Sequence, residues 1–366
     1  MSVQRLLQRF RDPQRARALL EQIHTLAVHP VRLMEFCGGH THAILRYGIP
    51  DLLPATIELS SGPGCPVCVT SAHEIDQAIA LARVPGIILT TFGDMIRVPG
   101  SHGSLAEAKA QGADVRVVYS PLDALSIAEQ NAPRPVAFLG VGFETTAPTV
   151  AAAVIAAERQ GLDNFTVCST HKLTPPATRA ILETGEIAID GIIGPGHVTT
   201  VTGSDAWRFL PDDYGVPCSI TGFEPVDILR SVLELVKMIA SSQPDVVNAY
   251  TRSVQPRGNQ PAQQAMERVF EVTDVDWRGL GRLTQSGLHL RPAYSRFDAL
   301  ARFPVDVAAP CDPPGCRCGD VLRGNIRPPT CHLFARGCTP QHPIGPCMVS
   351  AEGACAAYYQ YALEDR

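Results

Sequence analysis

Short apolar runs alternate with helical stretches along the first two thirds of the chain. Gly86–Thr91 and Asp114–Tyr119 are predicted strands, and Leu105–Gln111 between them is a predicted helix. The same rhythm returns further on, with predicted strands at Pro135–Leu139, Phe165–Ser169 and Ile187–Ile193 and predicted helices at Thr149–Arg159 and Val226–Ser241. Because strands that alternate with helices are typical of parallel sheets covered by helices, the pattern predicts two open parallel-sheet α/β domains.

The sequence predicts three units, and two changes in composition mark the last of them. We expect a first α/β domain in residues 1–120, a second in residues 121–254, and a linker with a C-terminal domain in residues 255–366. Gln255–Gln264 is polar and rich in Pro and Gly, which favours a linker. From Cys311 onward the chain is rich in Pro, Gly and Cys and has little periodicity. This tail therefore needs cross-links or a metal cluster to become ordered.

Composition and charge exclude several classes of protein. Apolar residues make up 45% of the 366 residues and charged residues 18%, which indicates a well-buried interior. No apolar run approaches the ~18–20 residues that a membrane span needs. The net charge of −5 and the lack of a basic stripe argue against nucleic acid as a partner. Met1–Arg17 reads as an amphipathic surface helix without a secretory signal, so we expect a soluble, cytoplasmic protein with no membrane partner.

Twelve cysteines then call for metal ligation or redox chemistry, because cytosolic thiols are normally kept reduced. Seven of them lie in the C-terminal tail from Cys311 onward, and six of these form the main candidate site: Cys316, Cys318, Cys331, Cys338, Cys347 and Cys355. Four thiolates satisfy either a [4Fe–4S] cluster or a structural zinc ion, and the wide, irregular spacing favours iron–sulfur without excluding zinc. The two surplus cysteines are either a dithiol beside the cluster or buried thiols.

A second motif is Cys65-Pro-Val-Cys68, which sits in a turn rich in Gly and Pro. Backbone amides and the helix expected to begin near Ser71 can lower a thiol pKa there and make the thiolate available. Two thiols at this spacing can form a disulfide or hold half of a metal site. The alternative is a pair of incidental loop cysteines.

Two further motifs follow predicted strands, where binding crevices of open α/β sheets lie. Cys37, His40 and His42 come directly after the apolar run Val31–Met34, and a thiolate with two imidazoles can bind a soft transition metal. The alternative is a Gly-rich turn that opens a helix, with the histidines capping it or facing solvent. Asp94 can accept a proton or bind a ligand, or it can simply pair with an Arg or cap a helix.

Taken together, six motifs resemble those of the HypD family, and the resemblance runs from about Met34 to Tyr359. The segments are Cys37–His42, Gly62–Cys68, Gly93–Gly100, Gly142–Thr146, Gly194–Val198 and Pro343–Tyr359. The resemblance implies two α/β domains facing a cleft and a smaller part that carries a [4Fe–4S] cluster. It also implies a scaffold for metal-centre assembly rather than a stand-alone turnover enzyme.

On such a scaffold a transient iron ion acquires two cyanides and one carbon monoxide, and the group then passes indirectly to the large subunit of a [NiFe]-hydrogenase. The partners that the resemblance implies are a HypC-type chaperone and HypE, which delivers cyanide made with HypF. Two alternatives stay open: an iron–sulfur, thiol-dependent enzyme acting on a small molecule, and a structural zinc adaptor.

The resemblance also assigns roles to residues of the first three motifs. Cys37 matches the family cysteine that holds the nascent iron together with a HypC cysteine, and His40 lies close enough in sequence to assist. Cys65 and Cys68 match the family dithiol, and Asp94 lies in a matching motif. For the cluster the expected ligands are Cys316, Cys331, Cys338 and Cys355, which leaves Cys318 and Cys347 as a second thiol pair.

Overall fold

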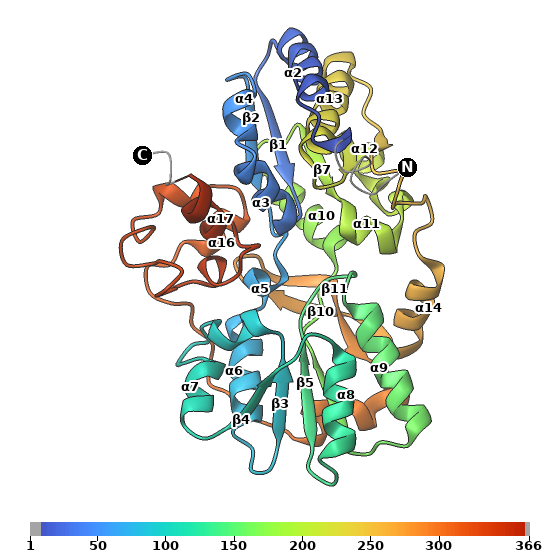
Figure 1. The fold of residues 1–366 in the computed structure, drawn as a ribbon, viewed down its shortest axis with the longest axis vertical. Helices are drawn as coiled ribbons and strands as arrows, with labels where there is room; N and C mark the ends of the chain where they lie inside the picture. Colours follow the sequence, from blue (N-terminus) through green and yellow to red (C-terminus); the bar gives the residue numbers. More distant parts are fainter. Residues whose placement is uncertain (1–8, 363–366) are drawn as a thin grey trace.

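The computed structural model describes residues 9–362, which form two lobes with a cysteine-rich segment at one side (Figure 1). The first lobe holds a five-stranded parallel sheet with the order β2-β1-β7-β8-β9. Its strands are β1 (Val31–Glu35), β2 (Ile57–Ser61), β7 (Gly191–Pro195), β8 (Cys218–Thr221) and β9 (Val246–Asn248). The second lobe holds a four-stranded parallel sheet with the order β4-β3-β5-β6. Its strands are β3 (Ile88–Thr91), β4 (Asp114–Val117), β5 (Val136–Gly140) and β6 (Phe165–Ser169). The predicted α/β class with two parallel sheets is confirmed.

The two sheets do not follow the order of the chain. The chain leaves the first sheet after β2, builds the whole second sheet with β3 to β6, and returns to the first sheet with β7. Register confirms this return, because Met34 of β1 lies opposite Ile192 of β7. Residue 120, the expected domain boundary, therefore falls between β4 and β5 of one sheet rather than between the two sheets.

Helices cover both faces of each sheet, which is why the strands are short apolar runs. On the first sheet, one face packs against α2 (Pro13–Leu26), α3 (Gly38–Arg46), α4 (Ile49–Leu52) and α13 (Pro225–Ser241). The other face packs against α10 (Thr174–Thr184), η2 (Ser204–Trp207) and the helices α11 (Gly196–Thr202) and α12 (Phe209–Tyr214). On the second sheet, α8 (Pro121–Gln130) and α9 (Ala147–Gln160) cover one face, and α6 (Ala72–Ala82) and α7 (Leu105–Ala110) the other.

Most predicted elements lie within a few residues of the observed ones. The strand at Phe165–Ser169 matches β6, and the predicted helix at Val226–Ser241 is α13. The strand expected from Ile187 begins only at Gly191. The expected linker at Gln255–Gln264 is only partly irregular, because α14 (Gln260–Val269) begins inside it. The expected N-terminal helix at Met1–Arg17 lies partly outside the described residues, and α2 begins at Pro13 behind an Asp12 cap.

An antiparallel hairpin joins the lobes. It consists of β10 (Phe270–Trp277) and β11 (Gly281–Leu290), drawn in orange between the two sheets in Figure 1. Its tip is bonded to the short helix α5 (Pro66–Val69), because the N–H of Arg278 donates to the carbonyl of Val69 at 2.9 Å. One apolar core continues from the second sheet through Cys68 and Trp277 to the first sheet.

The cysteine-rich segment has little regular structure of its own. It is preceded by η3 (Pro292–Phe297) and α15 (Ala299–Arg302), which pack on β6 of the second sheet. The helices of the segment itself are α16 (Cys318–Leu322) and α17 (Ala354–Tyr361), with single turns at η4 (Pro328–Thr330) and η5 (Pro346–Met348). The segment packs on α3, where His42 and the hydroxyl of Tyr361 are 3.1 Å apart. It also contacts β2, because Arg327 reaches Glu58 at 3.3 Å.

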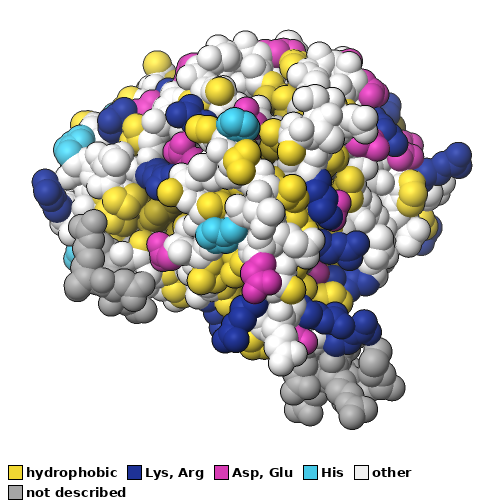
Figure 2. Space-filling model, turned by 90° about the horizontal axis from the view of Figure 1, so that it is seen from above, with side chains coloured by type: hydrophobic (Ala, Val, Ile, Leu, Met, Phe, Trp, Pro, Cys, Tyr) yellow, Lys and Arg dark blue, Asp and Glu magenta, His cyan; other side chains and the backbone are white. Residues whose placement is uncertain are grey.

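On the face drawn in Figure 2, Lys and Arg side chains are spread out with Asp and Glu side chains between them. Within residues 9–362, every helix is too short or too polar to cross a bilayer.

A buried ion pair fixes the hairpin to the second lobe. Lys172 is only 1% exposed, and its Nζ donates to both carboxylate oxygens of Glu74, at 2.9 and 3.0 Å, and to the carbonyl of Asp276 at 2.8 Å. We expect Lys172→Met to lower the free energy of unfolding by about 3 kcal/mol, because it leaves a carboxylate without its partner in the interior. Urea denaturation followed by circular dichroism measures this change.

The matched control for this prediction is Lys237→Met. Lys237 pairs with Glu234 at 3.2 Å, but its side chain is 45% exposed. Because exposed pairs contribute little, we expect this control to change stability by less than about 0.5 kcal/mol. Equal losses in the two variants would contradict the prediction.

Candidate functional site

The cysteine motifs meet between the two lobes, at the carboxyl ends of both sheets. In an open parallel sheet the binding crevice lies where the strand order reverses. That point falls between β1 and β7 in the first sheet and between β3 and β5 in the second. Cys37 follows β1, and Asp94 follows β3 in the turn η1 (Gly93–Arg97). The fold therefore brings Cys37 and Asp94 to the switch points of the two sheets.

Cys37 is the first residue of the site and the N-cap of α3. Its backbone N–H donates to Oε2 of Glu35 at 2.8 Å, and the N–H of Gly38 donates to the carbonyl of Gly64 at 2.9 Å. A Cβ on Gly64 would lie 2.3 Å from the nitrogen of Cys37. Only glycine fits there, so the Gly62–Cys68 loop packs directly on the backbone of Cys37.

The surroundings of Cys37 are acidic and buried. Burial raises the pKa of the Cys37 thiol to about 12, and the negative charges of Glu352 and Glu35 act in the same direction. Burial also raises the pKa of Glu35 to about 7, against the hydrogen bonds from Thr41 and the N–H of Cys37. A thiolate at Cys37 therefore needs a nearby cation, and a bound metal ion supplies one.

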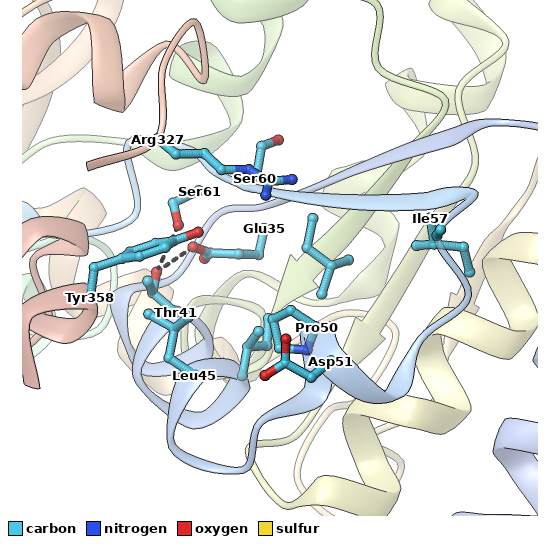
Figure 3. A pocket seen from close by; sticks show the side chains of 13 residues that line it. Glu35, Thr41, Leu45, Pro50, Asp51, Ile57, Ser60, Ser61, Arg327 and Tyr358 are labelled. Atoms are coloured by element: carbon cyan, nitrogen blue, oxygen red, sulfur yellow. Dashed lines mark hydrogen bonds between the residues drawn. The ribbon is translucent and has the colours of Figure 1, made fainter. Parts of the chain in front are cut away.

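Figure 3 shows where the carboxylate of Glu35 points. It faces a cavity of about 260 Å³, and Thr41 donates to its Oε1. Tyr358 and Arg327 reach this cavity from the cysteine-rich segment. Glu35 thus lies between the backbone of Cys37 and a cavity shared by the first lobe and the tail.

The two histidines of the first motif point in different directions. His40 is fully buried, its Nε2 donates to the carbonyl of Gly222 at 3.1 Å, and its ring stacks on Phe223 at 4.5 Å. Burial lowers the pKa of His40 to about 4, so the ring is neutral. Its Nδ1 has no hydrogen-bond partner within residues 9–362. His42 instead packs against Tyr361. The fold therefore does not bring both imidazoles to Cys37 in one metal site.

Cys65 and Cys68 form a buried thiol pair at the start of α5. The N–H of Cys68 donates to Sγ of Cys65, the N-cap residue, at 3.3 Å. Burial raises the pKa of Cys65. Burial also raises that of Cys68, but hydrogen bonds from Cys347 and Cys65 and the charge of Arg278 outweigh it and lower the pKa to about 6. The lowered pKa favours the thiolate at Cys68 over the thiolate at Cys65, and the thiolate is the reactive form of a thiol.

Asp94 lies beside this pair but is exposed. Its charge opposes ionisation of Cys68 and contributes to the raised pKa of Glu352, for which burial is the largest cause. Three motifs that are far apart in sequence thus influence one another electrostatically.

The six tail cysteines line a single pocket. Its other walls are mostly apolar side chains, with Arg317 and Gly345 completing the lining beside Val321, Leu333, Phe334 and Met348. The thiol of Cys347 lies within hydrogen-bonding reach of Cys318, Cys355 and Cys68. Cys347 therefore lies between this pocket and the Cys65–Cys68 pair, because η5 packs on α5.

The donor set of this pocket fits an iron–sulfur cluster. Soft thiolates in an apolar shell are the usual ligands of such clusters. Burial raises the pKa of Cys316 to about 12, and the nearby thiols of Cys318, Cys355 and Cys338 add to it, so several thiolates gather here only with metal charge to offset them. The N–H of Ile344 donates to Sγ of Cys338 at 3.3 Å. Among the described residues, no three His, Cys, Asp or Glu side chains are arranged to hold one metal ion.

Three other cysteines lie outside these motifs and outside the six-thiol pocket. Cys168 and Cys218 are buried in β6 and β8, and Cys311 is exposed. Sequence reasoning missed three charged residues of the site. A carboxylate ending the apolar strand Val31–Glu35 was a usable signal, and Glu352 lies inside a matched motif, but Arg278 gave no local signal.

Fold and site together define a two-sheet α/β protein that gathers thiols and carboxylates between its lobes. The comparisons agree with this class. The HypD family model, described as "Hydrogenase formation hypA family", matches residues 14–362. The chain therefore belongs to the HypD family of hydrogenase maturation factors.

Individual relatives cover almost the whole chain. "Hydrogenase maturation factor HypD" of Azotobacter vinelandii is 49% identical over 364 residues, 97% of this chain and 96% of the relative. The protein of that name from Escherichia coli (strain K12) is 46% identical over 369 residues, 99% of each. "Hydrogenase expression/formation protein HupD" of Azotobacter chroococcum mcd 1 is 48% identical over 364 residues, 97% of this chain and 96% of the relative.

Proposed function

We propose that this chain is the scaffold on which an iron ion receives two cyanides and one carbon monoxide before transfer to a [NiFe]-hydrogenase. The observation that carries the proposal is the convergence of three sets of thiols. Gly64 packs on Cys37, Cys65 follows in the same loop, and Cys347 joins Cys68 to the six-thiol pocket. A thiol that can bind iron and a thiol pair that can supply electrons thus lie next to each other.

In this proposal the iron is cargo and binds at Cys37, together with a cysteine of a HypC-type chaperone. The carboxylates of Glu35 and Glu352 favour a cation beside that thiolate. His40 is neutral and has a free Nδ1, so it can assist as a ligand or as a hydrogen-bond acceptor.

Cyanide release is the step that needs the thiol pair. HypE, charged with HypF, would present cyanide as a thiocyanate, R–S–C≡N. Attack of the Cys68 thiolate on its sulfur forms a mixed disulfide and expels cyanide to the iron. Cys65 then attacks Cys68, which releases R–S⁻ and a proton and leaves a Cys65–Cys68 disulfide. The carbon–sulfur bond is reduced by two electrons, and the two thiols are oxidised by two. Asp94 lies near enough to influence the charge on Cys68.

A [4Fe–4S] cluster, held by Cys316, Cys331, Cys338 and Cys355, would supply single electrons when bound. Cys318 and Cys347 then remain as a second thiol pair. Their own role is to connect the pocket with Cys68, because Cys347 is within reach of both Cys318 and Cys68. Reduced thiols of this kind suit a cytoplasmic location.

The test is complementation of a bacterium that lacks its own HypD and carries a [NiFe]-hydrogenase. We expect the chain to restore hydrogenase activity, and we expect the anaerobically isolated chain to contain iron. Two outcomes would support other functions instead. Zinc in place of iron would favour a structural adaptor, and turnover of a small molecule by the isolated chain would favour a thiol-dependent enzyme.

A further inference from the structure

Arg278 occupies a junction of three parts of the molecule. It follows β10 at the tip of the hairpin, and its N–H is bonded to α5 through Val69. The bridge between Thr70 and Trp277 fixes the same contact. The next residue, Gly279, packs on Gly319 of the cysteine-rich segment, where an added Cβ would lie 2.6 Å from the Gly319 Cα. The hairpin therefore carries the guanidinium to the boundary between the Cys65–Cys68 pair and the six-thiol pocket.

The guanidinium is buried and short of acceptors. Arg278 is 4% exposed, and its Nη2 donates to the carbonyl of Pro99 at 3.0 Å. Nε and Nη1 have no hydrogen-bond partner in residues 9–362. Nε lies 3.5 Å from Oδ1 of Asp312, whose side chain is 57% exposed, so solvent screens this ion pair. Unsatisfied buried donors are unfavourable, and those of a cation especially so.

Cys68 is where an anion forms beside this cation. The positive charge of Arg278 acts on the Cys68 thiol, while Asp94 acts in the opposite direction. In the disulfide form Cys68 carries no charge, so the unsatisfied donors of Arg278 gain nothing from it. In the reduced form a thiolate at Cys68 offsets the buried charge.

We propose that Arg278 is a positioning residue that favours the reduced, thiolate form of the Cys65–Cys68 pair over the disulfide. This inference rests on the thiol chemistry of the proposed function. The step is Cys65–S–S–Cys68 + 2 RSH → Cys65–SH + Cys68–S⁻ + RS–SR + H⁺, in which a low-molecular-weight thiol is the reductant. One sulfur–sulfur bond breaks and another forms, so atoms and electrons balance.

The experiment measures this equilibrium in the full-length, anaerobically isolated chain with glutathione as the thiol. Samples at a series of glutathione ratios are quenched, and free and oxidised thiols are alkylated with light and heavy reagents. Trypsin then releases the peptide Tyr47–Arg83, which contains Cys65 and Cys68 and no other cysteine. Mass spectrometry of this peptide reports the pair alone among the twelve cysteines.

We expect Arg278→Gln to increase the equilibrium constant for oxidation of the pair on the order of tenfold, which corresponds to a potential about 30 mV more negative. Arg278→Lys should restore most of the difference, because it keeps the charge. Arg323→Gln is the matched control: Arg323 bonds the same turn through the carbonyl of Gly279, so it tests the loss of an arginine from the junction. It should leave the constant unchanged.

A second variant covers the case in which Arg278→Gln does not fold. Asp312→Asn removes an exposed negative charge beside Arg278, so it should shift the constant in the opposite direction, by about twofold. Unchanged constants in Arg278→Gln, or in Asp312→Asn where the first variant is unfolded, would overturn the inference. A wild-type pair that never forms a reversible disulfide would overturn the thiol step of the proposed function as well.

Discussion

Replacing Cys37 with serine should reduce hydrogenase maturation at least about a hundredfold while the chain stays folded. A serine hydroxyl keeps the N-cap position of α3 but is a hard, weakly acidic oxygen that does not replace a thiolate as an iron ligand. The acidic neighbours Glu35 and Glu352 cannot compensate, because they favour the cation without providing the sulfur. Hydrogenase activity in the complemented strain measures the loss.

Cys311→Ser is the matched control for this prediction. Cys311 is exposed, and its described hydrogen bonds run only to Ser101. We expect this variant to restore activity to the wild-type level and both variants to melt at similar temperatures. Full activity in Cys37→Ser would show that iron does not bind at this thiol.

The second large effect concerns the six-thiol pocket. We expect wild-type protein isolated without oxygen to contain roughly four irons per chain, with a broad absorption band near ~400 nm, and Cys338→Ala to lose nearly all of both. Cys338 is buried in the pocket wall, and its sulfur accepts the N–H of Ile344, so the substitution removes one of the four expected ligands from a fixed position. Iron and zinc analysis beside the absorption spectrum measures the result.

Cys168→Ala controls for the loss of any buried thiol. Cys168 is as buried as Cys338 but lies in β6, outside the pocket. It should keep its iron and its spectrum. Zinc in the wild-type protein, or a spectrum unchanged in Cys338→Ala, would contradict a cluster at this pocket.

The electrostatics of the site show why part of it escaped sequence reasoning. Cysteine is uncommon enough that Cys65, Cys68 and the tail cysteines could be recognised as candidates by residue type and spacing. Arg278 is an ordinary charged residue, and nothing within a few positions of it distinguishes it from a surface residue. Glu352 lies inside a motif that matches the family, but its residue type alone gives it no role. Their importance follows from what lies beside them in the folded chain, because Arg278 is buried against α5 and the charge of Glu352 acts on the thiols of Cys37 and Cys65.

The two histidines of the first motif show how the secondary structure changes the meaning of a spacing. The sequence leaves open whether His40 and His42 both join Cys37 at a metal ion or belong to a Gly-rich turn. Two residues along a helix turn a side chain to a different face, so the two imidazoles point in different directions. One ring stacks on Phe223 of the first lobe, and the other bonds Tyr361 of the tail. Once α3 is known to begin at Gly38, the spacing of the two histidines shows that they lie on different faces of the helix.

By itself the sequence determined the local elements and the kind of chemistry. A short apolar run such as Phe165–Ser169 predicts a buried strand, because the pattern of apolar residues is set by positions next to one another in the chain. Only the tertiary structure decided that β1 pairs with β7. The first lobe is therefore built from the chain segments that precede and follow the second sheet. It also decided that Cys347 meets Cys68. Such contacts join residues more than a hundred positions apart, and they depend on how packed helices and sheets fit together, which no local pattern records.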